Sequence, residues 1–411
     1  MTEAALDLVR HDRALLKKPA ACCPACGSGQ THTFHEIRNV PANSCILFSS
    51  EEAARRCPTG DIRLALCAGC GFVFNSAFDL ARTEYSGRYE ETQAYSGTFN
   101  KFHRGLAEGL IEKHGLYGKR VVEIGCGKGE FLLLLAELGG NSCLGIDPGV
   151  NVERLRKPAR GELRVIPEFY SERHVAEAVD LVLCKMTLEH IPDAGRFIAS
   201  LRRGLGAQTH TIVFFQIPEA LRILRSCAFE DIYHEHCAYF TPGSLARLFR
   251  RNGFEVRALS VEYAGQYLTI EARPLGAGDP LRPALTSEDD LAEVARLVAT
   301  FPLRCSAKLA HWRQVLEQAR ADSKRVGLWG SGSKAVAFLS ALDPEARIRH
   351  VTDINPYRHN HFMPLSGQRI LPPTEFAAAR PDLVIVMNGI YQAEIRRDLA
   401  AMGLSPELRS L

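Results

Sequence analysis

The chain has 411 residues, 46% of them hydrophobic, and a formal charge of +3. This length predicts two or three domains, because single hydrophobic cores stop growing well before this size. So small and evenly spread a charge argues against nucleic acid or an anionic membrane as main partner, and no run of about 18 apolar residues offers a membrane span. The N-terminus, MTEAALDLVRHDRALLKK, alternates acids and bases without an apolar segment, so we expect no secretory signal and a cytoplasmic protein.

Two C-x-x-C pairs, each followed by glycine, mark the N-terminal segment: CCPACG at 22–27 and CAGCG at 67–71. Each turn can direct two thiolates at one ion, and two such turns complete a closed, structural tetrahedral zinc site. The alternatives are disulfides, chance cysteines, or Cys22 as a ligand in place of Cys23. The flanking chain looks polar and poor in strands, and without a basic stripe it does not indicate nucleic-acid binding. We expect Cys45 and Cys57 to be spare, and the predicted ligands are Cys23, Cys26, Cys67 and Cys70.

A strand, a glycine turn and a helix follow in KRVVEIGCGKGEFLLLLAELGG, and SCLGIDP supplies a second strand. Such alternation predicts a doubly wound α/β sheet. The turn reads E-x-G-x-G-x-G, not the G-x-G-x-x-G of dinucleotide binders, so it does not indicate a pyrophosphate site. A carboxylate beside it suits the cations of S-adenosylmethionine (SAM), and an acid about 20 residues further on is placed to accept the ribose hydroxyls. The alternative is a glycine turn that only packs. The candidate donor-binding residues are Glu123, Gly125, Gly127, Gly129 and Asp147.

Two later segments should reach the same edge of this sheet. Phe169 follows the strand RVIP, where it can border the adenine ring. The strand VDLVLCKM contains Lys185 and ends in TLEHIPD, which places Thr187 and His190 at the carboxyl edge, where open α/β sheets bind ligands. We add Phe169 and Lys185 to the donor-binding candidates.

The segment YHEH at 233–236 groups titratable side chains directly before the strand and helix start FTPGSLARLF. Such a group beside a donor pocket indicates acid/base chemistry, whereas the alternative is a solvated loop whose histidines only pack or cap. If the segment is extended, His234 points away from its neighbours' side of the chain.

The last third begins with helical periodicity over 286–323, which Pro302 should break, so we predict a helical connector there. RVGLWGSGSKAVAFLSAL, IRHVTDINP and DLVIVMNGIYQAEI then predict a second Rossmann-like unit. Its glycines Gly327, Gly330 and Gly332 are too loosely spaced to indicate NAD, and no other feature suggests redox chemistry.

EIGCGKGEF, GIDP and LEHIPD resemble the class I SAM-dependent methyltransferases. The four-cysteine segment, the run IYHEHCAYFTPGSLARLFRRNGFEV and the last domain extend the resemblance over almost the whole chain. Together they resemble the sugar C-methyltransferases, which methylate nucleotide-linked keto-deoxysugars in antibiotic pathways.

This resemblance implies active-site roles. A carbon beside a ketone becomes nucleophilic only after losing a proton, so the enzyme needs a base of near-neutral pKa and a hydrogen-bond donor for the enolate oxygen. In the family the histidine matching His236 is the proposed base; Glu235 can orient it, and Tyr233 or His190 can bond the oxygen. Tyr85 is our choice, over Tyr89 and Tyr95, for the family's pocket tyrosine. The candidate catalytic residues are His236, Glu235, Tyr233, His190 and Tyr85.

In the sugar enzymes the last domain closes over the acceptor, which implies Ser331, Lys334 and Asn388 as acceptor-site candidates. YAGQYLTIEA at 263–272 replaces a glycine-glycine-serine-leucine-arginine run of the family, so the arginine expected near a diphosphate is missing and the chain looks like a divergent branch.

We therefore predict a zinc-binding domain at 1–84, a SAM-dependent methyltransferase domain at 85–275, and a Rossmann-like acceptor-binding domain with its connector at 276–411. The expected function is C-methylation of a small polar acceptor, with a nucleotide sugar as one candidate. The alternatives are O- or N-methylation, or a zinc-containing binding protein with a vestigial SAM pocket. The sequence leaves the oligomeric state open.

Overall fold

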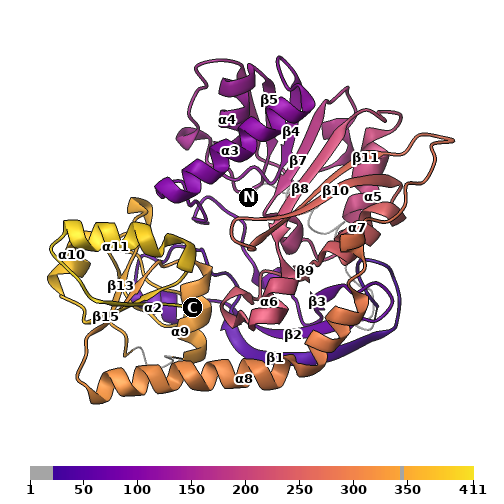
Figure 1. The fold of residues 1–411 in the computed structure, drawn as a ribbon. Coiled ribbons are helices and arrows are strands. Elements are labelled where there is room, and N and C mark those ends of the chain that lie inside the picture. The colour runs from indigo at the N-terminus through magenta and orange to yellow at the C-terminus, as the bar shows by residue number, and fades with distance from the viewer. Residues whose placement is uncertain (1–21, 343–346) are drawn as a thin grey trace.

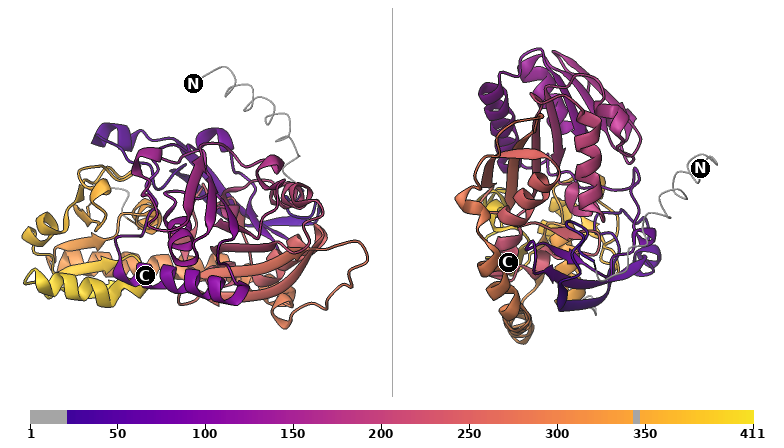
Figure 2. Two further views of the ribbon diagram at one scale, coloured as in Figure 1. Left: turned by 90° about the horizontal axis from the view of Figure 1, so that it is seen from above. Right: turned by 90° about the vertical axis from the view of Figure 1, so that its right-hand side faces the viewer.

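The computed structural model describes residues 22–342 and 347–411, and the expectation about the N-terminal signal falls outside them. The described residues form three sheets, joined along one side of the molecule by a long helix (Figure 1). Seen from above, the C-terminal unit forms one end of the molecule (Figure 2, left). Within these residues, no helix is both long and apolar enough to cross a membrane.

The central sheet has seven strands in the order β10-β11-β8-β7-β4-β5-β6. Strands β4 to β8 are parallel, and β11 runs antiparallel between β8 and β10, so the predicted doubly wound α/β fold is confirmed with an antiparallel edge. Because neighbouring residues of a strand face opposite sides, Val121 packs with α3 and α4 while Val122 packs with α5 and α7. The strands are β4 (Arg120–Ile124), β5 (Ser142–Ile146), β6 (Glu162–Ile166), β7 (Leu181–Lys185), β8 (Ile212–Pro218), β10 (Phe254–Glu262) and β11 (Tyr267–Pro274), and the helices are α3 (Gly97–His114), α4 (Glu130–Gly139), α5 (Ala194–Leu205), α6 (Ala220–Ser226) and α7 (Pro242–Arg251).

The N-terminal segment is a four-stranded sheet, so the expectation of a strand-poor chain is wrong. Its apolar residues alternate: Leu64 and Leu66 face a core shared with α8 and the C-terminal unit, while Ala65 and Cys67 face the core of the central sheet. The segment is therefore wedged between the other two parts. Its elements are β1 (Thr31–Pro41), α2 (Glu51–Arg55), β2 (Thr59–Cys67), β3 (Val73–Asn75) and β9 (Ala238–Tyr239), the last supplied from beyond YHEH.

The connector is a single helix, α8 (Leu291–Ala321), so the predicted break at Pro302 is wrong. Pro302 lies on the exposed face and removes only one backbone donor, while Phe301 and Cys305 beside it are buried. Tertiary packing of the buried face thus outweighs the local cost of proline.

The C-terminal unit is a five-stranded parallel sheet in the order β14-β13-β12-β15-β16, which confirms the second Rossmann-like fold. The turn between β12 and α9 lies at its carboxyl edge. The elements are β12 (Val326–Trp329), α9 (Ser333–Leu342), β13 (His350–Thr352), β14 (Ile370–Leu371), α10 (Pro373–Ala378), β15 (Leu383–Val386), α11 (Gln392–Ala401) and β16 (Glu407–Ser410).

Candidate active site

A cavity of about 1830 Å³ lies between the carboxyl ends of the central sheet and of the C-terminal sheet. The loops after β4, β5 and β7 line one side, and the turn at 330–335 with the residues after β13 and β15 lines the other. The segment 78–96 forms a third wall. Two open α/β sheets thus direct their ligand-binding edges at one space.

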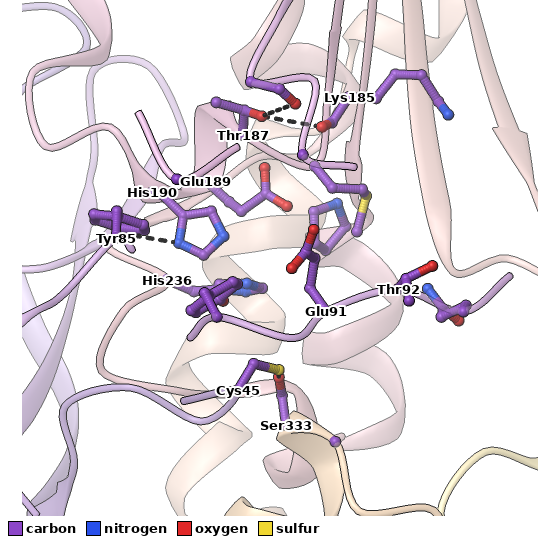
Figure 3. Close-up of a pocket in the computed structure, with 18 of the residues that line it drawn as sticks. Cys45, Tyr85, Glu91, Thr92, Lys185, Thr187, Glu189, His190, His236 and Ser333 are labelled. Carbon is purple, nitrogen blue, oxygen red and sulfur yellow. Dashed lines mark hydrogen bonds between the residues drawn. The ribbon is translucent and has the colours of Figure 1, made fainter. Parts of the chain in front are cut away.

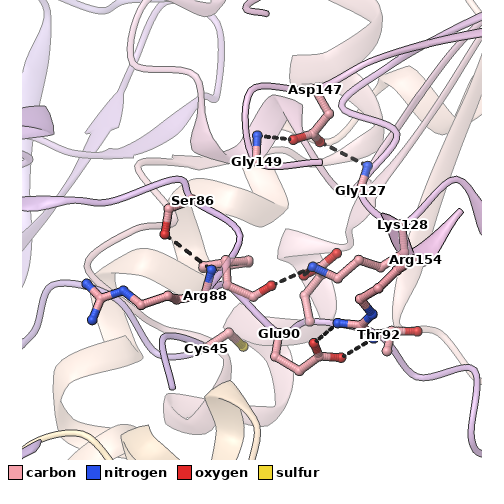
Figure 4. Close-up of polar contacts among 12 residues, drawn as sticks. Cys45, Ser86, Arg88, Glu90, Thr92, Gly127, Lys128, Asp147, Gly149 and Arg154 are labelled. Atoms are coloured by element: carbon pink, nitrogen blue, oxygen red, sulfur yellow. Dashed lines mark hydrogen bonds and ion pairs between the residues drawn. The ribbon is translucent and has the colours of Figure 1, made fainter. Parts of the chain in front are cut away.

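The glycine turn and Asp147, the predicted donor-binding residues, line the side of this cavity that the central sheet forms. Both oxygens of the Asp147 carboxylate accept backbone hydrogen bonds, from Gly127 at 2.9 Å and from Gly149 at 2.8 Å (Figure 4). Gly127 has φ +53°, and a Cβ there would lie 2.8 Å from Oε1 of Glu91, so only glycine fits without a shift. Gly125 also lines the cavity, whereas Gly129 does not and instead caps α4.

Glu123 and Lys185, two further donor-binding candidates, are buried and line the same side of the cavity. Burial raises the pKa of Glu123 to about 7, and its Oε2 has no hydrogen-bond partner among the described residues. Burial also lowers the pKa of Lys185 to about 8. The Lys185 ammonium lies 2.5 Å from Nε2 of His103 and 3.7 Å from the centre of the Phe131 ring, so its bonding is largely internal. Phe169 is 67% exposed at the rim.

Sequence reasoning missed Glu91, which lies beside the glycine turn. Burial raises its pKa to about 7, and its Oε2 lies 3.5 Å from the Lys128 ammonium. Glu91 lies in the same segment as the candidate pocket tyrosines Tyr85, Tyr89 and Tyr95. It belongs to no recognisable sequence motif, so the sequence alone did not indicate a role for it.

Histidines and tyrosines converge on the cavity from separate segments (Figure 3). The rings of His190 and His236 are perpendicular with centres 4.8 Å apart, and the Tyr233 ring is 4.6 Å from that of His236. The Tyr85 hydroxyl lies 3.2 Å from Nδ1 of His190. Burial, and then the neighbouring His190, hold the pKa of His236 well below its usual value, so this imidazole is neutral at pH 7.

Glu235 does not join this group. Its carboxylate accepts hydrogen bonds from Asn43 at 2.9 Å, the Ser44 amide at 3.0 Å and the Tyr89 hydroxyl at 3.1 Å, and it does not line the cavity. It therefore braces the loop at 43–44 rather than orienting His236. His234 faces away as expected, packed on Gly60 and 5.2 Å from the Phe78 ring.

The acceptor-site candidates of the C-terminal unit already have partners in the chain. Lys334 pairs with Asp231, which also pairs with Arg222 at 2.5 Å. Asn388 bonds Gln266 at 2.9 and 3.1 Å. The Ser331 hydroxyl bonds a carboxylate oxygen of Asp353 at 2.7 Å, and Ser331 does not line the cavity.

Cys45, expected to be spare, lines the cavity, with its sulfur 3.3 Å from the Ser333 hydroxyl. Cys57 is buried elsewhere. Neither belongs to the four-cysteine group.

The four predicted metal ligands do come together. Their sulfur atoms lie within 4.8 Å of one another, with 3.7 Å between Cys23 and Cys70 and between Cys26 and Cys67. Tetrahedral zinc with Zn–S bonds of about 2.3 Å requires sulfurs about 3.8 Å apart, so this group fits the ion. Cys23, Cys67 and Cys70 are also part of the core under the central sheet.

Two protein-family models match separate parts of the chain. Residues 99–259 match the methyltransferase domain family, and residues 281–404 match the C-methyltransferase C-terminal domain family. C-methyltransferase NovU of Streptomyces niveus is 26% identical over 324 residues, which span 75% of this chain and 76% of NovU. The chain combines a methyltransferase domain with a C-methyltransferase C-terminal domain. As such it is a SAM-dependent methyltransferase, as the sequence predicts.

Two further relatives match smaller shares of the chain. A ubiquinone biosynthesis O-methyltransferase of Aeromonas salmonicida is 32% identical over 36% of this chain and 69% of its own. The crystal structure of magnesium protoporphyrin IX methyltransferase from Synechocystis PCC 6803 with bound SAH covers 43% of this chain and 84% of its own, at 16% identity. The TM-score of this match is 0.34.

Proposed function

We propose that this enzyme transfers the methyl group of SAM to a carbon beside a ketone in a small polar acceptor. A nucleotide-linked keto-deoxysugar or a related secondary metabolite is the acceptor class that the similarity to NovU favours. The observation that carries the proposal is a buried, neutral His236 in the wall of a cavity whose other side holds the glycine turn and Asp147.

SAM supplies an electrophilic methyl group on a sulfonium. His236 accepts the proton from the acceptor carbon, and the hydroxyl of Tyr233 or Tyr85, or the ring of His190, donates a hydrogen bond to the enolate oxygen. Burial raises the pKa values of both tyrosines and keeps their hydroxyls protonated. The Tyr233 hydroxyl donates to Asp231 at 2.9 Å, so it would have to turn from that carboxylate to reach the enolate oxygen, whereas the Tyr85 hydroxyl contacts His190. Glu123 and Glu91 offer buried carboxylates to the donor's positive groups.

Asp147 gives a direct test of donor binding. Its carboxylate is fixed by two amides, and each oxygen retains a lone pair for the ribose hydroxyls. We expect Asp147→Ala to weaken SAM binding by about 1.5 to 3 kcal/mol in calorimetry, because a charge-assisted acceptor is lost.

The matched control is Asp353→Ala, because Asp353 occupies the corresponding place after the second strand of the C-terminal sheet and bonds Ser331. SAM affinity should be unchanged in this variant. The opposite pattern, weak binding only in Asp353→Ala, would move the donor to the C-terminal unit.

We further propose that Cys23, Cys26, Cys67 and Cys70 hold one structural zinc ion. Four sulfurs at tetrahedral spacing support this assignment. A four-thiolate site has no free position for substrate, so the ion would stabilise the fold rather than take part in the reaction.

O-methylation is the second candidate, because the ubiquinone biosynthesis O-methyltransferase of Aeromonas salmonicida is 32% identical over 36% of this chain. In that reaction His236 would deprotonate a hydroxyl instead of a carbon. The two reactions differ in heavy water: carbon deprotonation exchanges the acidic C–H for deuterium, whereas hydroxyl deprotonation leaves every C–H intact. We expect the wild-type enzyme to exchange this hydrogen in a keto-deoxysugar nucleotide, as followed by proton NMR. An O-methylated product formed without exchange would favour the second candidate.

A further inference from the structure

Glu189 is a buried carboxylic acid whose side chain makes no hydrogen bond within residues 22–342 and 347–411. It follows β7 in the short turn Leu188–His190 and lines the cavity with only 1% of its surface exposed. Neither side-chain oxygen has a hydrogen-bond partner among the described residues. Burying such a group unpaired is costly, so its position requires an explanation in terms of what enters or becomes charged beside it.

The carboxylate faces the two histidines of the site. One of its oxygens and one ring nitrogen each of His190 and His236 lie within 4.8 Å of one another (Figure 3). Glu235, the carboxylate next to His236 in sequence, is bonded to Asn43, Ser44 and Tyr89 outside the cavity. Of the two glutamates, Glu189 rather than Glu235 is therefore the one placed to act on His236.

We propose that Glu189 is the positioning residue for His236: its ionised carboxylate holds the ring and stabilises the imidazolium that forms when His236 takes the acceptor's proton. This inference rests on the proposed function. It transfers to Glu189 the role that the sequence suggested for Glu235.

The acceptor C–H bond breaks, its proton goes to the His236 ring, and the electron pair is held as the enolate. That pair then forms the new carbon–methyl bond while the sulfonium–methyl bond breaks and S-adenosylhomocysteine leaves. His236 returns its proton to solvent, and Glu189 carries its negative charge throughout.

The charges around His236 show why an anion is needed. The imidazolium is opposed by burial, by His190 and by Lys334, and only Asp231, already shared by Lys334 and Arg222, favours it. The other groups facing the ring are Tyr233 and Tyr239, whose raised pKa values keep them neutral. Burial raises the pKa of Glu189 to about 8, so it holds a proton in the empty cavity, and the positive sulfonium of SAM favours its ionisation.

The test is an NMR titration of histidine-labelled full-length enzyme saturated with SAM, with the His236 signal assigned by its loss in His236→Asn. An anion within about 4–6 Å raises a histidine pKa by one unit or more. We therefore expect Glu189→Gln to move the His236 midpoint to lower pH by about one unit. Glu235→Gln should leave this midpoint in place, because that carboxylate is bonded elsewhere.

Equal midpoints in wild type and Glu189→Gln would overturn the inference, and so would a wild-type ring that stays neutral down to pH 5. Elemental analysis that finds a second metal ion per chain in the wild type but not in Glu189→Gln would also overturn the inference. Glu189, His190 and His236 would then be the ligands of a metal ion. The titration needs no acceptor, so its failure is separate from a failure of deuterium exchange, which tests the proposed function itself.

Discussion

His236→Asn is expected to bind SAM normally and to lose about 10²- to 10⁴-fold in turnover, because only the proton acceptor of the rate-determining chemistry is removed. Asparagine is polar and of similar size, so the wall formed by His190 and Tyr233 should persist. Calorimetry with SAM and single-turnover kinetics with a keto-deoxysugar nucleotide separate the two effects. In heavy water the variant should also fail to exchange the acidic carbon-bound hydrogen.

The control for this variant is His234→Asn, which changes a histidine two residues away that packs on Gly60 outside the cavity. Turnover per folded molecule should stay close to wild type. Full activity in His236→Asn would remove His236 from the mechanism and make His190 the next candidate.

The second large effect is expected for Cys67→Ser, which removes one of four sulfurs around the proposed zinc ion. Structural zinc contributes about 10 to 16 kcal/mol to folding in small zinc-binding units. Cys67 also lies in the core under the central sheet, beside Phe72 and Phe74. We therefore expect loss of the metal by elemental analysis together with a lower unfolding temperature for the methyltransferase part, and not only local disorder at the N-terminus.

Cys22→Ser is the matched control, because Cys22 adjoins Cys23 but is not one of the four clustered sulfurs. It should retain one zinc ion and the wild-type unfolding temperature. Disulfides found by thiol titration of the native protein, with less than one metal ion per chain, would contradict the zinc assignment.

The sequence predicts the local part of this site well. The glycine turn, Asp147 and the C-x-x-C pairs each depend on residues a few positions apart, whose spacing follows from strand, turn and helix geometry. The structure places Gly127 against Asp147 and brings the four cysteines together as that geometry requires.

What the sequence could not predict depends on contacts between distant segments. The sequence suggested Glu235 as the partner of His236, because the two residues are adjacent in the chain. In the structure the Glu235 carboxylate instead accepts hydrogen bonds from Asn43 and Ser44. Glu189 lies in the LEHIPD motif, but without knowledge of where YHEH folds its proximity to His236 had no signal. Strand β2 was missed because its alternating residues fill two different cores, so neither of its faces has the polar pattern of a solvent-exposed face.

The central claim is methylation on carbon, and the product formed with SAM that contains a ¹³C-labelled methyl group tests it most directly. With a keto-deoxysugar nucleotide as acceptor, we expect the labelled methyl to show through-bond NMR correlations to a sugar carbon beside the ketone, with that carbon's hydrogen replaced. A labelled methyl attached to oxygen or nitrogen would contradict the claim.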